Sequence, residues 1–229
     1  MKAIKLLMMG PPGVGKGTFG KLLSKEFSIP ILTVGDEIRK IAAQESLSQV
    51  YIDIAKDVTK GKLINDGLAW AIMIHKLKDL DTSRGFIIDG YPRTATECEI
   101  MEMCDFQYDL VVSLKQHEEV IIKKTLARRV CESCGSTYNL ANIEYEGHKL
   151  PSMKPKVKGK CDNCGGNLIT RKDDTRSVIQ KRLFTFQVHT LPLEKYFAEK
   201  GKLIEFSPYG GVADYPQLSV KVKEKLGLP

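Results

Sequence analysis

The segment Gly10–Thr18, with the sequence GPPGVGKGT, places the strongest constraint on how this chain folds. A continuous apolar run over 3–9 precedes it, and apolar residues at helical spacing follow it as far as Phe27. Glycines let a main chain wrap around an anion with its N–H groups pointing inward, and a helix start adds a favourable dipole. Lys16 adds a mobile positive charge for phosphate oxygens. The coincidence of strand, loop, lysine and helix predicts a phosphate-binding loop rather than a simple Gly-rich turn.

Short apolar runs of strand length recur at 85–89, 109–114 and 202–206. Helices are expected between the strands, over about 15–27, 36–44, 48–60, 66–79, 94–103, 117–129, 175–200 and 214–226. Strands that alternate with helices predict an α/β fold with a doubly wound parallel sheet, whose strands are buried on both faces. A chain of 229 residues is long enough for one such core with inserted subdomains.

The overall composition is that of an ordinary globular protein, with 42% hydrophobic and 28% charged residues. No stretch has the length of a membrane-spanning helix. The formal net charge of +7 suits nucleotides, suits nucleic acid, and is equally compatible with solubility alone. The apolar run at 3–9 resembles the start of a signal peptide, but it leads directly into the Gly-rich loop, so we interpret it as a strand. We therefore expect an intracellular protein.

Four of the six cysteines form two C-x-x-C pairs, Cys131 with Cys134 and Cys161 with Cys164. Two such pairs, each followed by glycine, are typical of a four-cysteine zinc site. Because four thiolates fill the coordination shell, the zinc would be structural and would stiffen an insert too small for a core of its own. Two disulfides or free thiols are the alternatives, although metal is favoured in a chain without an export signal. His148 lies in the same insert and is predicted to be a surface residue rather than a ligand.

A second motif, Asp89-Gly90-Tyr91-Pro92-Arg93, follows the strand at 85–89. It stands at a carboxyl strand end, where open α/β sheets bind their ligands. Weaker signals are Gly35-Asp36-x-x-Arg39 and Gly61-Lys62-Leu63-Ile64, which by themselves fit a helix start and solvated surface charges. Arg128, Arg171 and Arg182 stand around the cysteine-bearing insert. Fixed cations of this kind stabilise the negative charge that phosphoryl transfer spreads over oxygen atoms.

The motifs GxPGxGKGT and DG[FY]PR, in this order and over essentially the whole chain, resemble the adenylate kinase family in its long-lid form with a four-cysteine zinc site. The resemblance implies a P-loop doubly wound five-stranded parallel sheet flanked by helices, with a helical insert that binds the nucleoside monophosphate (NMP) and a zinc-containing lid. The implied domains are a P-loop core of residues 1–33, 65–130 and 172–229, an NMP-binding segment 34–64 and a zinc lid 131–171.

The resemblance also implies roles for individual residues. In the family, the residue at Asp89 acts through water on Mg²⁺, and the residue at Arg93 grips the acceptor's phosphate. The catalytic residues are expected to be Lys16, Asp89, Arg93, Arg128, Arg171 and Arg182. The site of the nucleoside triphosphate (NTP) is expected to comprise Gly13, Val14, Gly15, Lys16, Gly17, Thr18, Arg128, Thr137 and Tyr138. The NMP site is expected to comprise Val34, Gly35, Arg39, Lys62, Leu63, Ile64, Gly90, Arg93, Glu97, Arg171 and Arg182. The metal ligands are Cys131, Cys134, Cys161 and Cys164.

Four positions depart from the family pattern. Val34 replaces a usual Thr, Glu97 replaces the Gln that reads the acceptor's adenine, and Lys124 replaces an Arg that often packs on the donor base. Phe19 stands where members that use ATP carry Gln, and where members that use GTP carry an apolar residue. An ionised Glu accepts hydrogen bonds but cannot donate them, so Glu97 leaves the acceptor base open.

The resemblance therefore implies reversible transfer of a phosphoryl group from Mg-NTP to an NMP, foremost ATP + AMP = 2 ADP, with Mg²⁺ and structural Zn²⁺ as cofactors. Alternatives are a GTP:AMP phosphotransferase and a kinase for another NMP. Alternatives of a different class are a catalytically inactive nucleotide-binding protein and a zinc-ribbon nucleic-acid binder; the second leaves the phosphate loop unexplained. Nucleotides (ATP or GTP, and AMP) are the expected partners of a cytoplasmic monomer, without nucleic acid or membrane; a mitochondrial location is the alternative.

Overall fold

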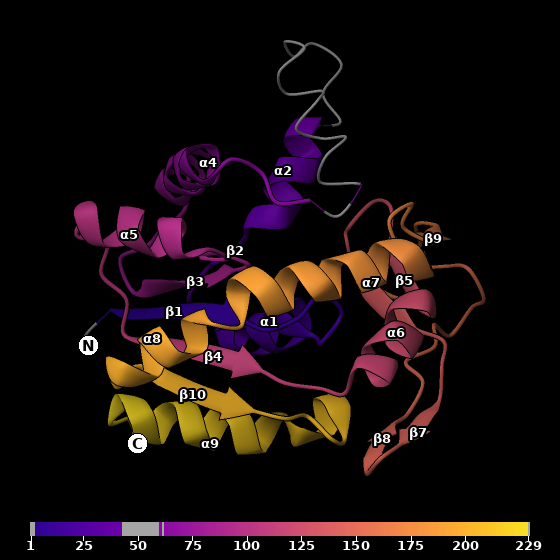
Figure 1. Ribbon diagram of the computed structural model, residues 1–229. Helices are drawn as coiled ribbons and strands as arrows, with labels where there is room; N and C mark the ends of the chain where they lie inside the picture. Colours follow the sequence, from indigo (N-terminus) through magenta and orange to yellow (C-terminus); the bar gives the residue numbers. More distant parts are fainter. Residues whose placement is uncertain (1–2, 43–59, 61, 229) are drawn as a thin grey trace.

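The computed structural model describes residues 3–42, 60 and 62–228, without the side chains of 39, 41 and 42 (Figure 1). Five strands form one parallel sheet in the order β10–β4–β1–β3–β2. The strands are β1 (Ile4–Met9), β2 (Ile31–Thr33), β3 (Gly85–Asp89), β4 (Leu110–Leu114) and β10 (Leu203–Phe206). Because β3 and β4 pair with opposite sides of β1, the carboxyl end of β1 is the point at which open sheets of this kind bind ligands.

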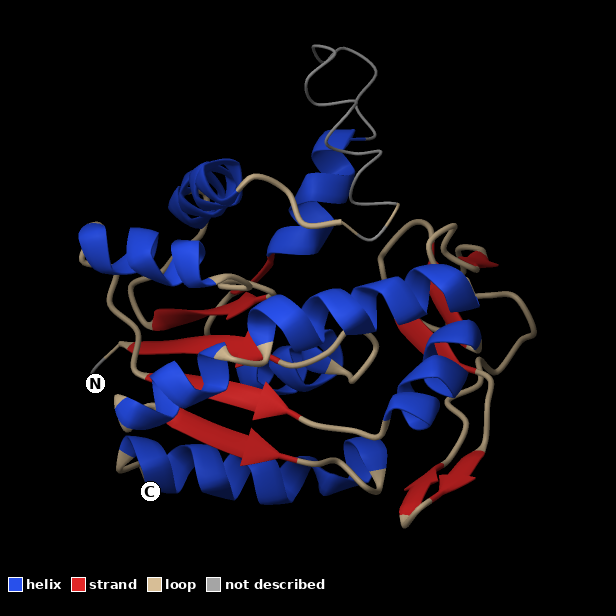
Figure 2. Cartoon of the chain, in the orientation of Figure 1, coloured by secondary structure: helices blue, strands red, loops and turns tan. Residues whose placement is uncertain are grey.

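Helices cover both faces of the sheet (Figures 1 and 2). Leu6 and Met8 of β1 are buried in a cluster with residues of α1 and α9, whereas Leu7 and Met9 are buried with residues of α2, α4, α5 and α8. Successive side chains of a strand point to opposite faces, so a continuous apolar run fills both layers. The helices are α1 (Lys16–Phe27), α2 (Val34–Ala42), α4 (Asp66–Lys78), α5 (Ala95–Met103), α8 (Leu193–Glu199) and α9 (Tyr215–Leu226).

The fold class and the four strands named from the sequence are confirmed, and β2 is an additional short strand. Two expected helices were wrong in extent. The helix expected over 117–129 ends earlier, as α6 (Glu118–Leu126), because the next residues pair as a strand of the insert. The stretch expected over 175–200 is divided into α7 (Arg176–Thr185), a π-helix (Phe186–Thr190) and α8, with Pro192, which lacks an N–H, between the last two. The helix expected over 48–60 falls almost wholly on residues outside the description.

The cysteine-bearing insert forms a small antiparallel sheet in the order β6–β5–β9. Its strands are β5 (Arg128–Cys131), β6 (Thr137–Asn139) and β9 (Leu168–Ile169). A separate hairpin of β7 (Ile143–Tyr145) and β8 (His148–Leu150) lies between β6 and β9 in the chain.

The β7–β8 hairpin packs on the core rather than on the rest of the insert. Ile143 and Leu150 are buried against Val120 of α6, and the N–H of Lys149 donates to the carbonyl of Tyr209 at 2.8 Å. The His148 ring stacks on that of Tyr209, with ring centroids 4.6 Å apart. His148 is only 4% exposed, so its prediction as a surface residue was wrong. The partner that buries it is 61 positions away in the sequence (209 − 148).

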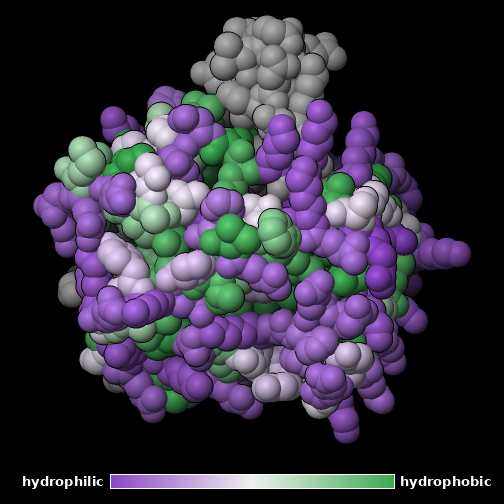
Figure 3. Space-filling model, in the orientation of Figure 1, coloured by the Kyte–Doolittle hydropathy of each residue, from purple (hydrophilic) through white to green (hydrophobic). Residues whose placement is uncertain are grey.

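The surface is largely hydrophilic on the face seen in Figure 3, with apolar side chains in smaller patches between charged ones. Within the residues that the structure describes, no helix is long and apolar enough to cross a membrane.

Candidate functional site

The Gly-rich loop connects β1 to α1 at the carboxyl edge of the sheet. Gly10, Gly13 and Gly15 have φ angles of +133°, +83° and +116°, which residues with a Cβ rarely adopt. A Cβ at Gly13 would lie 2.2 Å from the hydroxyl oxygen of Thr125 in α6. Glycine is therefore required here both by the conformation of the loop and by its close approach to α6.

Lys16 is the first residue of α1 and folds back over the loop. Its Nζ donates to the carbonyl oxygens of Gly10 at 2.7 Å and of Pro11 at 3.0 Å. Burial lowers the pKa of Lys16 to about 8, and the nearby positive charges of Arg93, Arg128 and Arg182 act in the same direction. The carboxylate of Asp89 opposes this shift. The site thus concentrates positive charge, which favours a polyanionic ligand.

Asp89 ends β3 beside the loop and is buried. A Cβ on Gly17 would lie 3.4 Å from Asp89 Oδ2, so the carboxylate faces the start of α1. Arg93 follows in the same motif, and its Nε donates to the carbonyl of Gly90 at 2.8 Å. One carboxylate and one guanidinium of this motif therefore lie close enough to Lys16 to act on its charge.

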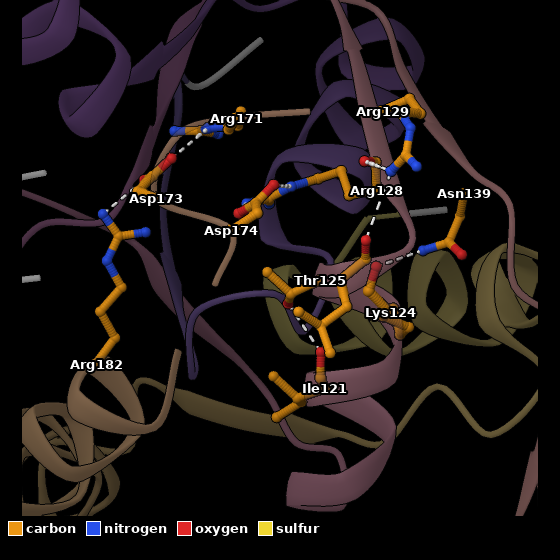
Figure 4. A network of polar contacts seen from close by, with 11 residues as sticks. Ile121, Lys124, Thr125, Arg128, Arg129, Asn139, Arg171, Asp173, Asp174 and Arg182 are labelled. Carbon is orange, nitrogen blue, oxygen red and sulfur yellow. Dashed lines mark hydrogen bonds and ion pairs between the residues drawn. The ribbon is translucent and has the colours of Figure 1, made fainter. Parts of the chain in front are cut away.

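Three further arginines are brought together by contacts with two aspartates, Asp173 and Asp174, which lie just before α7 (Figure 4). Asp174 accepts two hydrogen bonds from Arg128, at 2.9 Å from Nε and 2.5 Å from Nη2. Asp173 lies between the other two, 3.4 Å from Nε of Arg171 and 2.7 Å from Nη2 of Arg182. Both carboxylates are buried, and such bidentate or bridging contacts hold guanidinium planes in fixed orientations.

A single cleft of about 1190 Å³ brings most of the expected site residues together. Those that line it are Gly13, Gly15, Lys16, Gly17, Thr18, Gly35, Lys62, Leu63, Ile64, Asp89, Gly90, Arg93, Arg128, Thr137, Tyr138, Arg171 and Arg182. Val14, Val34 and Glu97 are not among the lining residues, and all three are buried. The side chain of Arg39, like residue Gly61, lies outside the described part of the chain.

Two positions that depart from the family pattern contact the core or the loop. Phe19 is buried beside β10 and packs edge-on against Phe206, with ring centroids 6.0 Å apart. Lys124 of α6 donates from Nζ to the carbonyl of Val14 and to Oε1 of Gln116, both at 2.8 Å. Burial lowers the pKa of Lys124 to about 8. Lys124 therefore holds the phosphate loop through Val14 and is also one of the residues that line the cleft.

Two stretches that line the cleft were not expected from the sequence. One is the stretch 210–213 before α9, most of which lies in a short 3-10 helix (Gly211–Asp214), and the other comprises Ile143 and Leu150 of the β7–β8 hairpin. Neither stretch carries a charged motif or a recognisable spacing, so only the docking of the hairpin on the core reveals them. The hydroxyl of Tyr138, by contrast, is engaged inside the insert, where it donates to Sγ of Cys161 at 3.5 Å and accepts from the N–H of Asp162 at 2.7 Å.

The four paired cysteines converge in the insert. Their sulfur atoms all lie within 4.8 Å of one another, with Cys131–Cys164 and Cys134–Cys161 each at 3.5 Å. A tetrahedral zinc with bonds of about 2.3 Å would set its sulfur ligands about 3.8 Å apart, which falls within this range. No pair is joined as a disulfide. The donor set therefore fits a structural zinc ion.

Comparison with known proteins gives one consistent result. The family model described as "Adenylate kinase" matches residues 8–202. The chain is 36% identical over 220 residues to "Probable adenylate kinase 1, chloroplastic" of Oryza sativa subsp. japonica, covering 94% of this chain and 74% of the relative. It is 34% identical to "Adenylate kinase" of Clostridium botulinum strain Hall, covering 88% and 90%, and 32% identical to that of Clostridium kluyveri, covering 98% of each.

Proposed function

This chain belongs to the adenylate kinase family and catalyses reversible phosphoryl transfer, ATP + AMP = 2 ADP; from that premise we propose which residues bind the two nucleotides and which carry the transfer. The observation on which the proposal rests is that Lys16, Asp89, Arg93 and the three clustered arginines line one cleft. An inactive nucleotide-binding protein would not need five cations and a carboxylate in one cleft.

The Gly-rich loop holds the β and γ phosphates of the donor through its main-chain N–H groups. The phosphates compete with the carbonyls of Gly10 and Pro11 for Lys16 Nζ, and their negative charge favours the protonated form of this lysine. Thr137 and Tyr138 line the same cleft, and we assign them to the donor. The hydrogen bond from Lys124 Nζ to the carbonyl of Val14 supports the conformation of the loop.

Arg93 holds the phosphate of the acceptor, and Lys62, Leu63 and Ile64 lie on the wall of the cleft beside its base. Arg128, Arg171 and Arg182 stabilise the negative charge on the transferred group, because preorganised cations cost no reorganisation during the reaction. Their orientation is supported by Asp173 and Asp174, which are already paired with them.

The proposal includes two metal ions, Mg²⁺ at the donor phosphates and Zn²⁺ in the lid. Asp89, a buried carboxylate beside the loop, is the residue that would hold Mg²⁺ through water, and Mg²⁺ supplies charge neutralisation on the donor phosphates. Cys131, Cys134, Cys161 and Cys164 would hold Zn²⁺, which stabilises the fold of the lid. The domain division into a core of 1–33, 65–130 and 172–229, an NMP segment 34–64 and a lid 131–171 belongs to the same proposal.

The choice of nucleotides is tested by a coupled assay over a grid of NTP donors and NMP acceptors. We expect the highest kcat/KM for ATP with AMP. A higher value for GTP with AMP would support the GTP:AMP alternative, and a higher value with another monophosphate would replace AMP. Absence of transfer with every pair would refute the proposal.

We also propose that one chain acts alone on free nucleotides in the cytoplasm, without nucleic acid or membrane as a partner. Light scattering should give a single mass near 25.6 kDa. A mass of twice that value would contradict a monomer.

A further inference from the structure

Arg93 makes three hydrogen bonds, two with nearby residues of the chain and one with the distant Thr190. Its main-chain N–H donates to Oε2 of Glu97 at 2.5 Å, and its main-chain carbonyl accepts from Oγ1 of Thr190 at 2.8 Å. Its Nε donates to the carbonyl of Gly90 at 2.8 Å. Both sides of the Arg93 main chain are therefore held by side chains, in addition to the internal contact within the motif.

Glu97 is oriented toward Arg93 rather than toward the cleft. It lies in the first turn of α5, where Thr94 caps the helix by accepting from the N–H of Glu97 at 3.1 Å. In a common capping arrangement, a glutamate at this position reaches back to the N–H of the cap residue; here it reaches one residue further, to Arg93. Glu97 is 4% exposed and is not among the residues that line the cleft. A residue that reads the acceptor's base would need its carboxylate in that cleft.

Thr190 approaches Arg93 from the opposite side. It is the last residue of the π-helix Phe186–Thr190, which directly continues α7, the helix that carries Arg182. Thr190 is buried, although it is one of the residues that line the cleft. π-Helical turns are rare and frequently occur at functional sites. The Thr190 hydroxyl thus joins the helix of one phosphate-binding arginine to the main chain of another.

We propose that Glu97 and Thr190 are positioning residues for Arg93, which hold its main chain so that the guanidinium meets the acceptor's phosphate, and that Glu97 does not read the acceptor's base. This inference rests on the proposed function, since it requires Arg93 to bind the acceptor. It differs from the expectation that Glu97 takes the place of a base-reading Gln.

The experiment compares the variants Glu97→Ala, Glu97→Gln, Thr190→Val and Thr190→Ser, with Glu99→Ala as a control at an exposed position of the same helix. Initial rates are measured with AMP, GMP, CMP and UMP at saturating ATP, and the KM for ATP is measured separately. Far-ultraviolet circular dichroism and thermal unfolding establish that each variant folds.

Loss of one hydrogen bond to the Arg93 main chain should lower kcat/KM for the acceptor about ten-fold in Glu97→Ala and in Thr190→Val. The factor should be the same for every acceptor that the unaltered enzyme uses, because a phosphate-binding arginine does not sense the base. Glu97→Gln and Thr190→Ser should remain within about three-fold of the unaltered enzyme, since each keeps the required acceptor or donor group. The KM for ATP and the Glu99→Ala control should not change.

A loss in Glu97→Ala that differs among the four acceptors, or a changed acceptor preference in Glu97→Gln, would overturn the inference while leaving the proposed function intact. So would full activity of Thr190→Val. If Glu97→Ala does not fold, Glu97→Gln and the two Thr190 variants still decide between these outcomes. Absence of transfer by the unaltered protein with every nucleotide pair would overturn both the proposed function and this inference.

Discussion

Replacing Asp174 by Asn tests how much the Arg128–Asp174 pair contributes to the stability of the fold and to the rate of phosphoryl transfer. Asp174 has no exposed side-chain surface, and Arg128 retains 22% of its own. Asparagine keeps the shape of the side chain but removes the charge and presents N–H groups to a guanidinium that can only donate. Truncating one partner of a buried pair costs about 3–5 kcal/mol. Because Arg128 can still reach solvent through the cleft, we expect about 2–3 kcal/mol.

This loss should lower the unfolding temperature by about 4–12 °C in a chain of this length. Under the proposed assignment of Arg128 to the transferred group, the rate of phosphoryl transfer should fall about ten-fold or more, since Asp174 no longer fixes the guanidinium. Differential scanning calorimetry and the coupled assay measure the two effects on the same preparation.

Asp79→Asn is the matched control. The Lys76–Asp79 pair is separated by 3.4 Å, and its side chains are 32% and 57% exposed. Exposed pairs contribute about 0–1 kcal/mol, so this variant should unfold within about 4 °C of the unaltered protein and retain its activity. Equal unfolding temperatures and equal rates for Asp174→Asn and Asp79→Asn would refute the reasoning.

Three further outcomes follow from the phosphate loop and the cysteines. Lys16→Met should slow phosphoryl transfer about 100-fold or more without unfolding the chain. Lys25→Met, at an exposed position of the same helix, should leave the rate unchanged. Similar rates for the two variants would contradict the role of Lys16. Burial lowers the pKa of Lys16 from 10.5 to about 8, so this lysine loses its charge as the pH rises through 8. The KM for ATP should therefore rise above about pH 8. A KM that stays constant from pH 7 to 10 would count against this reasoning. Metal analysis should find one zinc per chain in the unaltered protein and in the control Cys104→Ser. Removal of the zinc by a chelator should lower the unfolding temperature. Protein that contains no zinc would disprove the four-cysteine site.

The sequence by itself determined the parts of this protein whose chemistry lies in neighbouring residues. The phosphate loop needs glycines, a lysine and a helix start in direct succession, and a zinc knuckle needs two cysteines at a fixed short spacing, so both can be recognised locally. The buried strands of a parallel sheet are continuous apolar runs, which is why the alternation of strands and helices and the α/β class were also predictable.

The tertiary structure alone decided which distant residues meet. Nothing near His148 in the sequence indicates that Tyr209 covers it, and the end of α6 at Leu126 follows from strand pairing within the insert rather than from any local breaker. The direction of the Glu97 carboxylate depends in the same way on the path of the main chain at Arg93. Side-chain orientation and burial are set by packing between elements far apart in the chain, so the pattern of residues along the sequence does not contain them.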